Sequence, residues 1–207
     1  MNNLPKPSPL FKHWNLKEDI VYLNHGAFGA CPKHIIAKQK SYIDRLEQEP
    51  TQFSTRTFFD IYHESKKSLA SFVGTSEHNI YFVPNTTIGV NHVLHNQSES
   101  SSDWLITNHA YGAVARTVEN ISQSKECDIV RTNIPYPVDS KESILTSIED
   151  QVTKNTSIAI IDYISSASAI IFPIKEIIDL LHSKNIRVIV DGAHAPGMVD
   201  FNLDILY

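Results

Sequence analysis

Short apolar runs rich in β-branched residues alternate with amphipathic segments through most of this chain. The apolar runs predict strands at residues 79–83, 103–107, 128–132, 157–162 and 186–190. Apolar positions that recur on one face predict helices over 58–73, 86–96, 112–122, 140–152 and 173–185. Repeated strand–helix units predict an α/β fold, with a mostly parallel sheet covered by helices on both faces.

The N-terminal part of the chain follows a different pattern. Residues 1–19 are rich in proline at first and predict an extended arm. A short apolar strand at 21–23 enters a turn with two glycines, and an amphipathic helix follows over 32–48. We therefore expect an N-terminal arm and helix over 1–57 and a larger domain over 58–207.

Composition narrows the class of protein. The chain has 207 residues and a net charge of −5, which argues against a general nucleic-acid binder. No apolar run approaches the length of a membrane-spanning helix, so we expect no membrane association. The two cysteines, Cys31 and Cys127, form neither a metal-binding spacing nor a disulfide framework, which favours a reducing, cytoplasmic location. The ten histidines lack ligand spacing, so we expect no structural metal site.

The last predicted strand is followed directly by an acidic residue, Asp191, at its carboxyl end. Its apolar sequence, IRVIV, is followed by Asp191, by small residues and by His194. In open α/β sheets ligands bind beyond the carboxyl ends of the strands, and an isolated buried carboxylate is unfavourable. Asp191 therefore needs a partner, and one group that such an aspartate binds is the protonated ring nitrogen of pyridoxal phosphate (PLP).

Three further strand-end loops carry groups that suit the rest of such a cofactor. Thr86 and Thr87 stand at the start of a predicted helix, where their hydroxyls can cap it and free backbone N–H groups attract an anion. His109 or Tyr111, after the second strand, offers a flat ring, and residues 163–168 supply hydroxyl groups. Taken singly, each loop fits an ordinary capped turn; together they match a phosphorylated aromatic cofactor.

Motifs of several other enzyme classes are missing from the sequence. There is no Gly-x-Gly-x-x-Gly turn after the first strand, no Gly-x-Ser-x-Gly elbow and no His-Glu-x-x-His pair. Residues 84–91 also lack the Gly-Lys-Ser/Thr of a Walker loop. These absences leave the PLP interpretation without a competing motif.

Two stretches of sequence resemble the fold-type I PLP enzymes of the class V aminotransferase family. Residues 23–32 read LNHGAFGACP and residues 191–197 read DGAHAPG, while the run TTIGVN at 86–91 is less specific support. The resemblance extends over residues 23–204. It is closest to the isopenicillin N epimerase-like branch, which is related to cysteine desulfurases and kynureninases. It implies the large domain of a fold-type I enzyme, with PLP as cofactor.

Several residues around the cofactor acquire roles through this resemblance. Asp191 would pair with the pyridine nitrogen and keep it protonated, so that the ring can absorb carbanion charge. Thr86 and Thr87 would hold the phosphate. Ser166 and His194 would lie near the phenolic oxygen of the ring.

The resemblance also implies a stacking residue and a loop that faces the substrate. Tyr111 or His109 would stack on the cofactor ring, with Tyr111 preferred. Asn24, His25 and Gly26 would border the substrate, a small amino acid.

One residue of the family's site has no counterpart in this chain. The lysine that forms the Schiff base with PLP follows the aspartate on the next strand-end loop of the family, and residues 192–207 contain no lysine. The resemblance places that lysine beyond Tyr207, together with the small C-terminal domain. We therefore expect a C-terminally incomplete large domain, the N-terminal portion of a longer enzyme, with little activity by itself.

The predicted parent function is a PLP-dependent transformation of an amino acid through a carbanion at Cα, as in class V aminotransferases and epimerases. Transamination, racemisation and elimination share this chemistry, and all three stay open. The alternatives are a cysteine desulfurase or lyase, and a non-catalytic remnant that binds PLP or a partner. The resemblance also implies a homodimer in the full-length protein.

Overall fold

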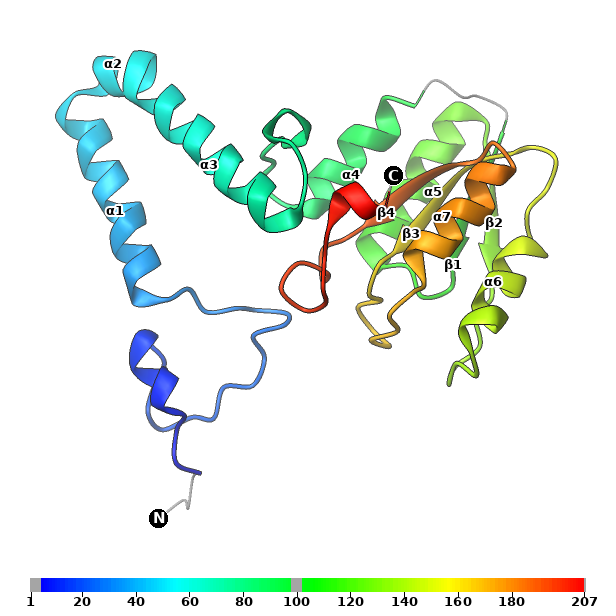
Figure 1. The fold of residues 1–207 in the computed structure, drawn as a ribbon, viewed down its shortest axis with the longest axis horizontal. Coiled ribbons are helices and arrows are strands. Elements are labelled where there is room, and N and C mark those ends of the chain that lie inside the picture. The colour runs from blue at the N-terminus through cyan, green and yellow to red at the C-terminus, as the bar shows by residue number, and fades with distance from the viewer. Residues whose placement is uncertain (1–4, 98–101, 207) are drawn as a thin grey trace. The chain divides into compact units, whose positions relative to one another are not determined.

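The computed structural model describes residues 5–97 and 102–206, and its internal contacts divide the chain into two units. The first unit is Met1–Lys67 and the second is Ser68–Tyr207. Helix α3 (Phe58–Val73) runs across the division. Figure 1 shows the elements of both units.

Helices dominate the first unit. After a 3-10 turn at Pro9–His13, the chain forms α1 (Lys33–Gln48), α2 (Pro50–Gln52), a π-helical turn at Phe53–Thr57 and the start of α3. The helix over 32–48 that the apolar periodicity predicts is therefore present. Pro50 opens α2 at its first position, where a missing N–H leaves no hydrogen bond unmade.

Residues 21–23 do not form the expected strand; the segment is irregular. Aromatic side chains hold it and the turn that follows. Trp14 Nε1 donates to the carbonyl oxygen of Ala30 at 2.9 Å, and the rings of Tyr22 and His25 meet edge to face with their centroids 4.9 Å apart. Such contacts fix a loop without the neighbouring strand that a β-ladder requires.

The second unit is built on a four-stranded parallel sheet with the strand order β2-β1-β3-β4. Its strands are β1 (Asp103–Thr107), β2 (Asp128–Thr132), β3 (Thr156–Asp162) and β4 (Arg187–Asp191). Nearly all residues of β1 and β3 are buried, as expected for the central strands of a parallel sheet that is covered on both faces.

Helices α4 (Thr86–His95) and α5 (Gly112–Lys125) cover one face of the sheet (Figure 1). Their apolar stripes pack on the side chains that β1 and β3 direct to this face, which are Trp104, Ile106, Ile158 and Ile160. We call this the α4/α5 face.

The opposite face is covered by α6 (Lys141–Glu149) and α7 (Ile174–Ser183). These helices pack on the alternate side chains of the same strands, Leu105, Ala159 and Ile161. Helices on both faces of a parallel sheet confirm the predicted α/β class.

The expected strand at residues 79–83 is wrong. The chain instead forms a 3-10 turn at Glu77–Asn79 and then runs irregularly to Pro84. Ile80 packs against Ala70 and Val73 of α3 in a small cluster of its own. An apolar run that packs on a helix gives the same local pattern as a buried strand, and the pattern alone does not separate the two.

The order of the strands reverses beside β1. Helix α5 leads from β1 to β2 on one side, whereas α6 carries the chain back to β3 on the other side of β1. Ligands of open α/β sheets bind outside the carboxyl ends of the strands at such a reversal.

In residues 5–97 and 102–206, no helix combines the length and apolarity needed to cross a membrane.

Candidate functional site

Asp162 and Asp191 end neighbouring strands at the same level of the sheet. The parallel register pairs Asp162 of β3 with Asp191 of β4, and each residue is only 5% exposed. Asp162 lies two residues after Ile160, and Asp191 lies two residues after Ile189; both isoleucines pack on the α4/α5 face. Side chains alternate along a strand, so both acids stand side by side on that face, at the carboxyl edge.

The two acids form an anionic site at the carboxyl edge of the sheet. Burial, and then the charge of Asp191, raise the pKa of Asp162 from 3.8 to about 7, against a hydrogen bond from the backbone N–H of Tyr111. Asp191 Oδ1 accepts a hydrogen bond from the backbone N–H of Ala193 at 3.1 Å. Within the part of the chain that the structure describes, no lysine or arginine forms an ion pair with either acid.

Helices α4 and α5 lie parallel, with their first turns at the same end. Asn91 Nδ2 of α4 donates to Thr117 Oγ1 of α5 at 3.0 Å, and these residues hold the same position in their helices. At the far end, Lys125 Nζ donates to the carbonyl oxygen of Gln97, just past the end of α4. Because the start of α5 reaches Asp162 through the preceding backbone N–H, the start of α4 lies at the same edge of the sheet.

Thr86 and Thr87 occupy the first turn of α4, but neither residue caps the helix. Asn85 is the cap, and its Oδ1 accepts from the backbone N–H of Ile88 at 2.9 Å. The backbone N–H groups of both threonines precede the first intrahelical donor, so they have no acceptor within the helix. With the cap supplied by Asn85, this turn offers N–H and hydroxyl donors to an anion.

His109 joins the strand-end loops to one another. Its Nδ1 lies 2.8 Å from Ser168 Oγ, and its Nε2 lies 2.9 Å from the carbonyl oxygen of Ile134. Both ring nitrogens are therefore used within the protein. Tyr111, at the cap position of α5, keeps 47% of its surface exposed.

The remaining predicted cofactor residues lie in the loops that follow the two acids. Ser166 is exposed in the loop after β3, next to the buried Ser165, whose Oγ accepts from the backbone N–H of Ile170 at 2.9 Å. His194 is half-buried in the turn after Asp191. These positions place both residues on loops that leave the carboxyl edge of the sheet.

Asn24, His25 and Gly26 belong to the first unit. They form a turn in which the backbone N–H of Phe28 donates to the carbonyl oxygen of Asn24 at 2.9 Å. His25 Nδ1 accepts from the backbone N–H of Ala30 at 3.4 Å. The glycine-rich turn is thus a defined local structure of its own unit.

Asp162, the buried partner of Asp191, is not among the site residues that the sequence predicts. A signal was present, because Asp162 ends the apolar run at 157–162 as Asp191 ends the last strand. Two parallel strands that both finish in an acid place those acids at one edge whenever the strands are neighbours. That the strands are neighbours and in register is known only from the fold.

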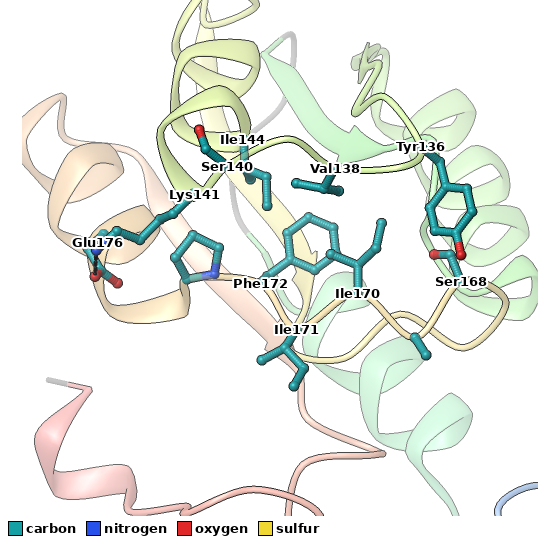
Figure 2. Close-up of a pocket in the computed structure, with 12 residues that line it drawn as sticks. Tyr136, Val138, Ser140, Lys141, Ile144, Ser168, Ile170, Ile171, Phe172 and Glu176 are labelled. Atoms are coloured by element: carbon teal, nitrogen blue, oxygen red, sulfur yellow. Dashed lines mark hydrogen bonds and ion pairs between the residues drawn. The ribbon is translucent and has the colours of Figure 1, made fainter.

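A separate pocket of about 610 Å³ lies on the other face of the sheet, between α6, α7 and the loop after β3 (Figure 2). Val138, Ile144 and Phe172 give it an apolar interior, and Figure 2 shows Lys141 and Glu176 paired at one side. Their Nζ–Oε1 distance is 2.8 Å. Ser168, from the hydroxyl-bearing segment 163–168, lines this pocket, whereas Tyr111, Ser166 and Asp191 do not. The described residues contain no group of three or more His, Cys, Asp or Glu side chains able to hold a metal ion.

Two curated proteins with enzyme names resemble the chain over most of its length. It is 24% identical over 211 residues to an L-cysteine desulfhydrase-like protein of Epichloe uncinata, covering 99% of this chain and 45% of that protein. It is 23% identical over 189 residues to the isopenicillin N epimerase of Streptomyces clavuligerus, covering 91% and 48%. The chain therefore spans about half the length of the curated relatives it matches.

A solved structure shares the fold. A mutant of C-DES, with glycine covalently linked to its PLP cofactor, matches with a TM-score of 0.81 at 16% identity. The match covers 91% of this chain and 51% of that chain. It confirms the predicted large-domain fold of the fold-type I enzymes.

The sequence model of the Aminotransferase class-V family matches residues 21–206. The matched region includes the glycine turn at 23–32, the first turn of α4 and the motif at 191–197. The members of this family are PLP-dependent enzymes. This chain belongs to the aminotransferase class-V family.

Proposed function

We propose that this chain binds PLP at the carboxyl edge of its parallel sheet, with Asp191 on the pyridine nitrogen. The observation that carries the proposal is the burial of Asp191 and Asp162 together, with no cation paired to them in the described residues. A buried anionic pair is unfavourable unless it is compensated. A protonated ring nitrogen supplies the missing charge and donates a hydrogen bond to the carboxylate.

The first turn of α4 suits the phosphate of the cofactor. Thr86 and Thr87 present backbone N–H and hydroxyl donors there, and the N-terminus of α5 lies alongside without a side-chain cap. Two adjacent helix N-termini favour a doubly charged anion through their dipoles as well as their donors. Phosphate and ring would therefore be held by different elements of the same edge.

Three other residues complete the proposed cofactor site. Tyr111 is the stacking residue, since its side chain is half exposed whereas both ring nitrogens of His109 are bonded within the protein. Ser166 and His194 approach the phenolic oxygen from the loops that follow β3 and β4. Their exposed and half-buried positions leave their polar groups available to a ligand.

For the whole protein we propose a PLP-dependent conversion of a small amino acid, with Asn24, His25 and Gly26 bordering the substrate. The bound cofactor supplies an electron sink for the bond that breaks next to the amino group. Cleavage of a carbon–sulfur bond in a cysteine-like substrate is the first candidate, because a relative is named as desulfhydrase-like. Epimerisation is the second, because another is named as an epimerase.

Two further proposals concern the oligomeric state and the cellular location of the protein. A homodimer is supported by the family resemblance and by the large apolar side chains exposed on the helices of the first unit, Ile35, Ile43 and Phe59. A reducing, cytoplasmic location is supported by the sequence, in which Cys31 and Cys127 form neither a metal-binding spacing nor a disulfide framework. Sedimentation of the full-length protein tests the first proposal, and fractionation of cells tests the second.

Binding of pyridoxamine 5′-phosphate tests the cofactor site. This form carries an amine in place of the aldehyde, so it does not react with surface lysines. Asp191→Asn should weaken its binding about tenfold or more, since a hydrogen bond to a charged group contributes roughly 1.5–3 kcal/mol. Asp128→Asn removes an exposed acid of β2 and is the matched control. Equal affinity of wild type and Asp191→Asn would overturn the assignment.

Activity in the protein that contains the family's lysine separates the two candidate reactions. Release of sulfide from L-cysteine supports carbon–sulfur cleavage. Exchange of the α-proton for deuterium without sulfide release supports epimerisation. If neither sulfide release nor exchange of the α-proton is observed with cysteine or its analogues, both candidate reactions are contradicted.

A further inference from the structure

Asp162 and Asp191 lie close enough for two negative charges at these positions to repel each other strongly. Paired residues of neighbouring parallel strands are about 4.8 Å apart at the backbone, and both side chains point to the α4/α5 face. Each residue is 5% exposed, so water screens their repulsion poorly. Two carboxylates that share such a site do not ionise together, and one of them keeps a proton.

The groups around Asp162 leave Asp191 as the charge that acts on it. The start of α5 contributes a backbone N–H, from Tyr111, and α4 presents uncharged threonines. On the adjoining loops, His109 is held by its hydrogen bonds, and His194 follows Asp191; neither shifts the pKa of Asp162, whereas Asp191 raises it. Tyr163, the next residue, packs with the opposite face of the sheet.

We propose that Asp162 is a positioning residue that carries the pair's proton while the site is empty and releases it when a cationic ring nitrogen binds beside Asp191. The inference rests on the proposed function, because it takes the ring cation as the ligand of the pair. It goes beyond that function by giving Asp162 a defined part in cofactor binding.

Charge balance explains the release. In the empty site the pair holds one proton and carries one negative charge. The arriving cation offsets the charge of Asp191, which removes the repulsive part of the rise in the pKa of Asp162, and its positive charge favours the ionised carboxylate against the cost of burial. The proton then passes to the buffer. Two carboxylates and one ring cation then carry the same net charge as the empty pair. Asp162 thus lets the site accept a cation without changing its total charge.

Calorimetric titration with pyridoxamine 5′-phosphate measures the proton directly. The titration is repeated in buffers of different ionisation enthalpy, at a pH about one unit below the pKa of Asp162, which is about 7. The wild-type chain should release about one proton more per ligand than Asp162→Asn, whose amide does not titrate. Asp128→Asn, which removes an exposed acid, should match the wild type.

The outcomes separate this proposal from the proposed function. Equal proton release by wild type and Asp162→Asn overturns the role of Asp162 while leaving the cofactor site in place. Failure of the wild type to bind pyridoxamine 5′-phosphate overturns the proposed function, and this inference with it.

A second measurement does not depend on the folding of the variant. The carboxyl carbon of Asp162 is titrated by nuclear magnetic resonance in the wild-type chain, with and without pyridoxamine 5′-phosphate. The midpoint should fall when the ligand is bound. An unchanged midpoint in the ligand-saturated chain overturns the proposal.

Discussion

Ser168 Oγ hydrogen-bonds to His109 Nδ1 at 2.8 Å, so the loop after β3 is tied to the loop after β1. On the other side of the ring, His109 Nε2 meets the carbonyl oxygen of Ile134 at 2.9 Å. A carbonyl only accepts, so Nε2 carries the ring proton and Nδ1 accepts from the serine hydroxyl. The imidazole thereby links the loops after three strands and orients the segment that leads to Tyr111.

Loss of that hydroxyl should destabilise the second unit. Ser168→Ala is expected to lower the free energy of unfolding by about 1–2 kcal/mol, because the hydroxyl hydrogen-bonds to His109 Nδ1 and, at 2.7 Å, to Ser165 Oγ. Ser166→Ala, at an exposed position in the same loop, should change it by less than about 0.5 kcal/mol. Urea unfolding followed by circular dichroism measures both variants. If the two serines prove equivalent, the His109 linkage is not a stabilising feature.

Asp162 should make the stability of the chain depend on pH. Below its unfolded pKa of 3.8 both states hold the proton, and above the folded value of about 7 both have lost it. Between these values only the folded state is protonated, so the free energy of unfolding falls as pH rises through this window. The slope is at most about 1.4 kcal/mol per pH unit.

Asp162→Asn removes this dependence, because an amide does not titrate. Relative to the control Asp128→Asn, the variant should gain stability steadily as pH rises from the unfolded to the folded pKa. Urea unfolding at a series of pH values across the window measures the difference. A constant difference between the two variants would mean that Asp162 titrates alike in both states.

The hydroxyls of Thr86 and Thr87 in α4 should strengthen binding of the cofactor's phosphate group and leave binding of its ring unchanged. Replacing both Thr86 and Thr87 with valine removes the hydroxyls and keeps the shape of the side chains. Binding of pyridoxamine 5′-phosphate should weaken about tenfold, which corresponds to about 1.4 kcal/mol. Binding of pyridoxamine, which lacks the phosphate, should stay the same. Equal losses for both ligands would place the threonines elsewhere in the site.

Borohydride reduction tests the expected absence of the family's lysine from this chain. Residues 192–207 contain no lysine, so reduction of the chain with PLP should give only slow, scattered labelling of surface lysines. Mass spectrometry of digested wild type and Asp191→Asn should show the same pattern. One lysine that is fully labelled in the wild type and spared in Asp191→Asn would show that another position supplies the covalent link.

Local pattern was sufficient for most of the second unit. Apolar periodicity located β1 to β4 and the helices between them, because each segment repeats with the period of the element it forms. It also placed Asp191 at a carboxyl edge. It failed at residues 79–83, because Ile80 owes its burial to α3 and not to a sheet.

Contacts between residues far apart in the chain could not be predicted from the sequence. Ser168 and His109 are 59 positions apart, and nothing near either residue indicates the other. Which of three adjacent polar residues caps α4 depends on where the first helical turn begins, and the structure shows Asn85 at that position. The partnership of Asp162 with Asp191 requires both the strand order and the register, which only the folded sheet determines.

The register of β3 with β4 has a consequence for how this fold can diversify. The spacing of the two acids is fixed by backbone hydrogen bonds between the strands, continued by the bond from the Tyr163 N–H to the carbonyl oxygen of Asp191, and not by the loop residues beyond Tyr163 and Ala193. Insertions or exchanges in those loops can therefore reshape what the site recognises without moving the carboxylates. A single-residue insertion within either strand would instead turn one acid to the opposite face. Proton chemistry and recognition are thus separable properties of one sheet edge, and mutation can alter the second while the first is kept.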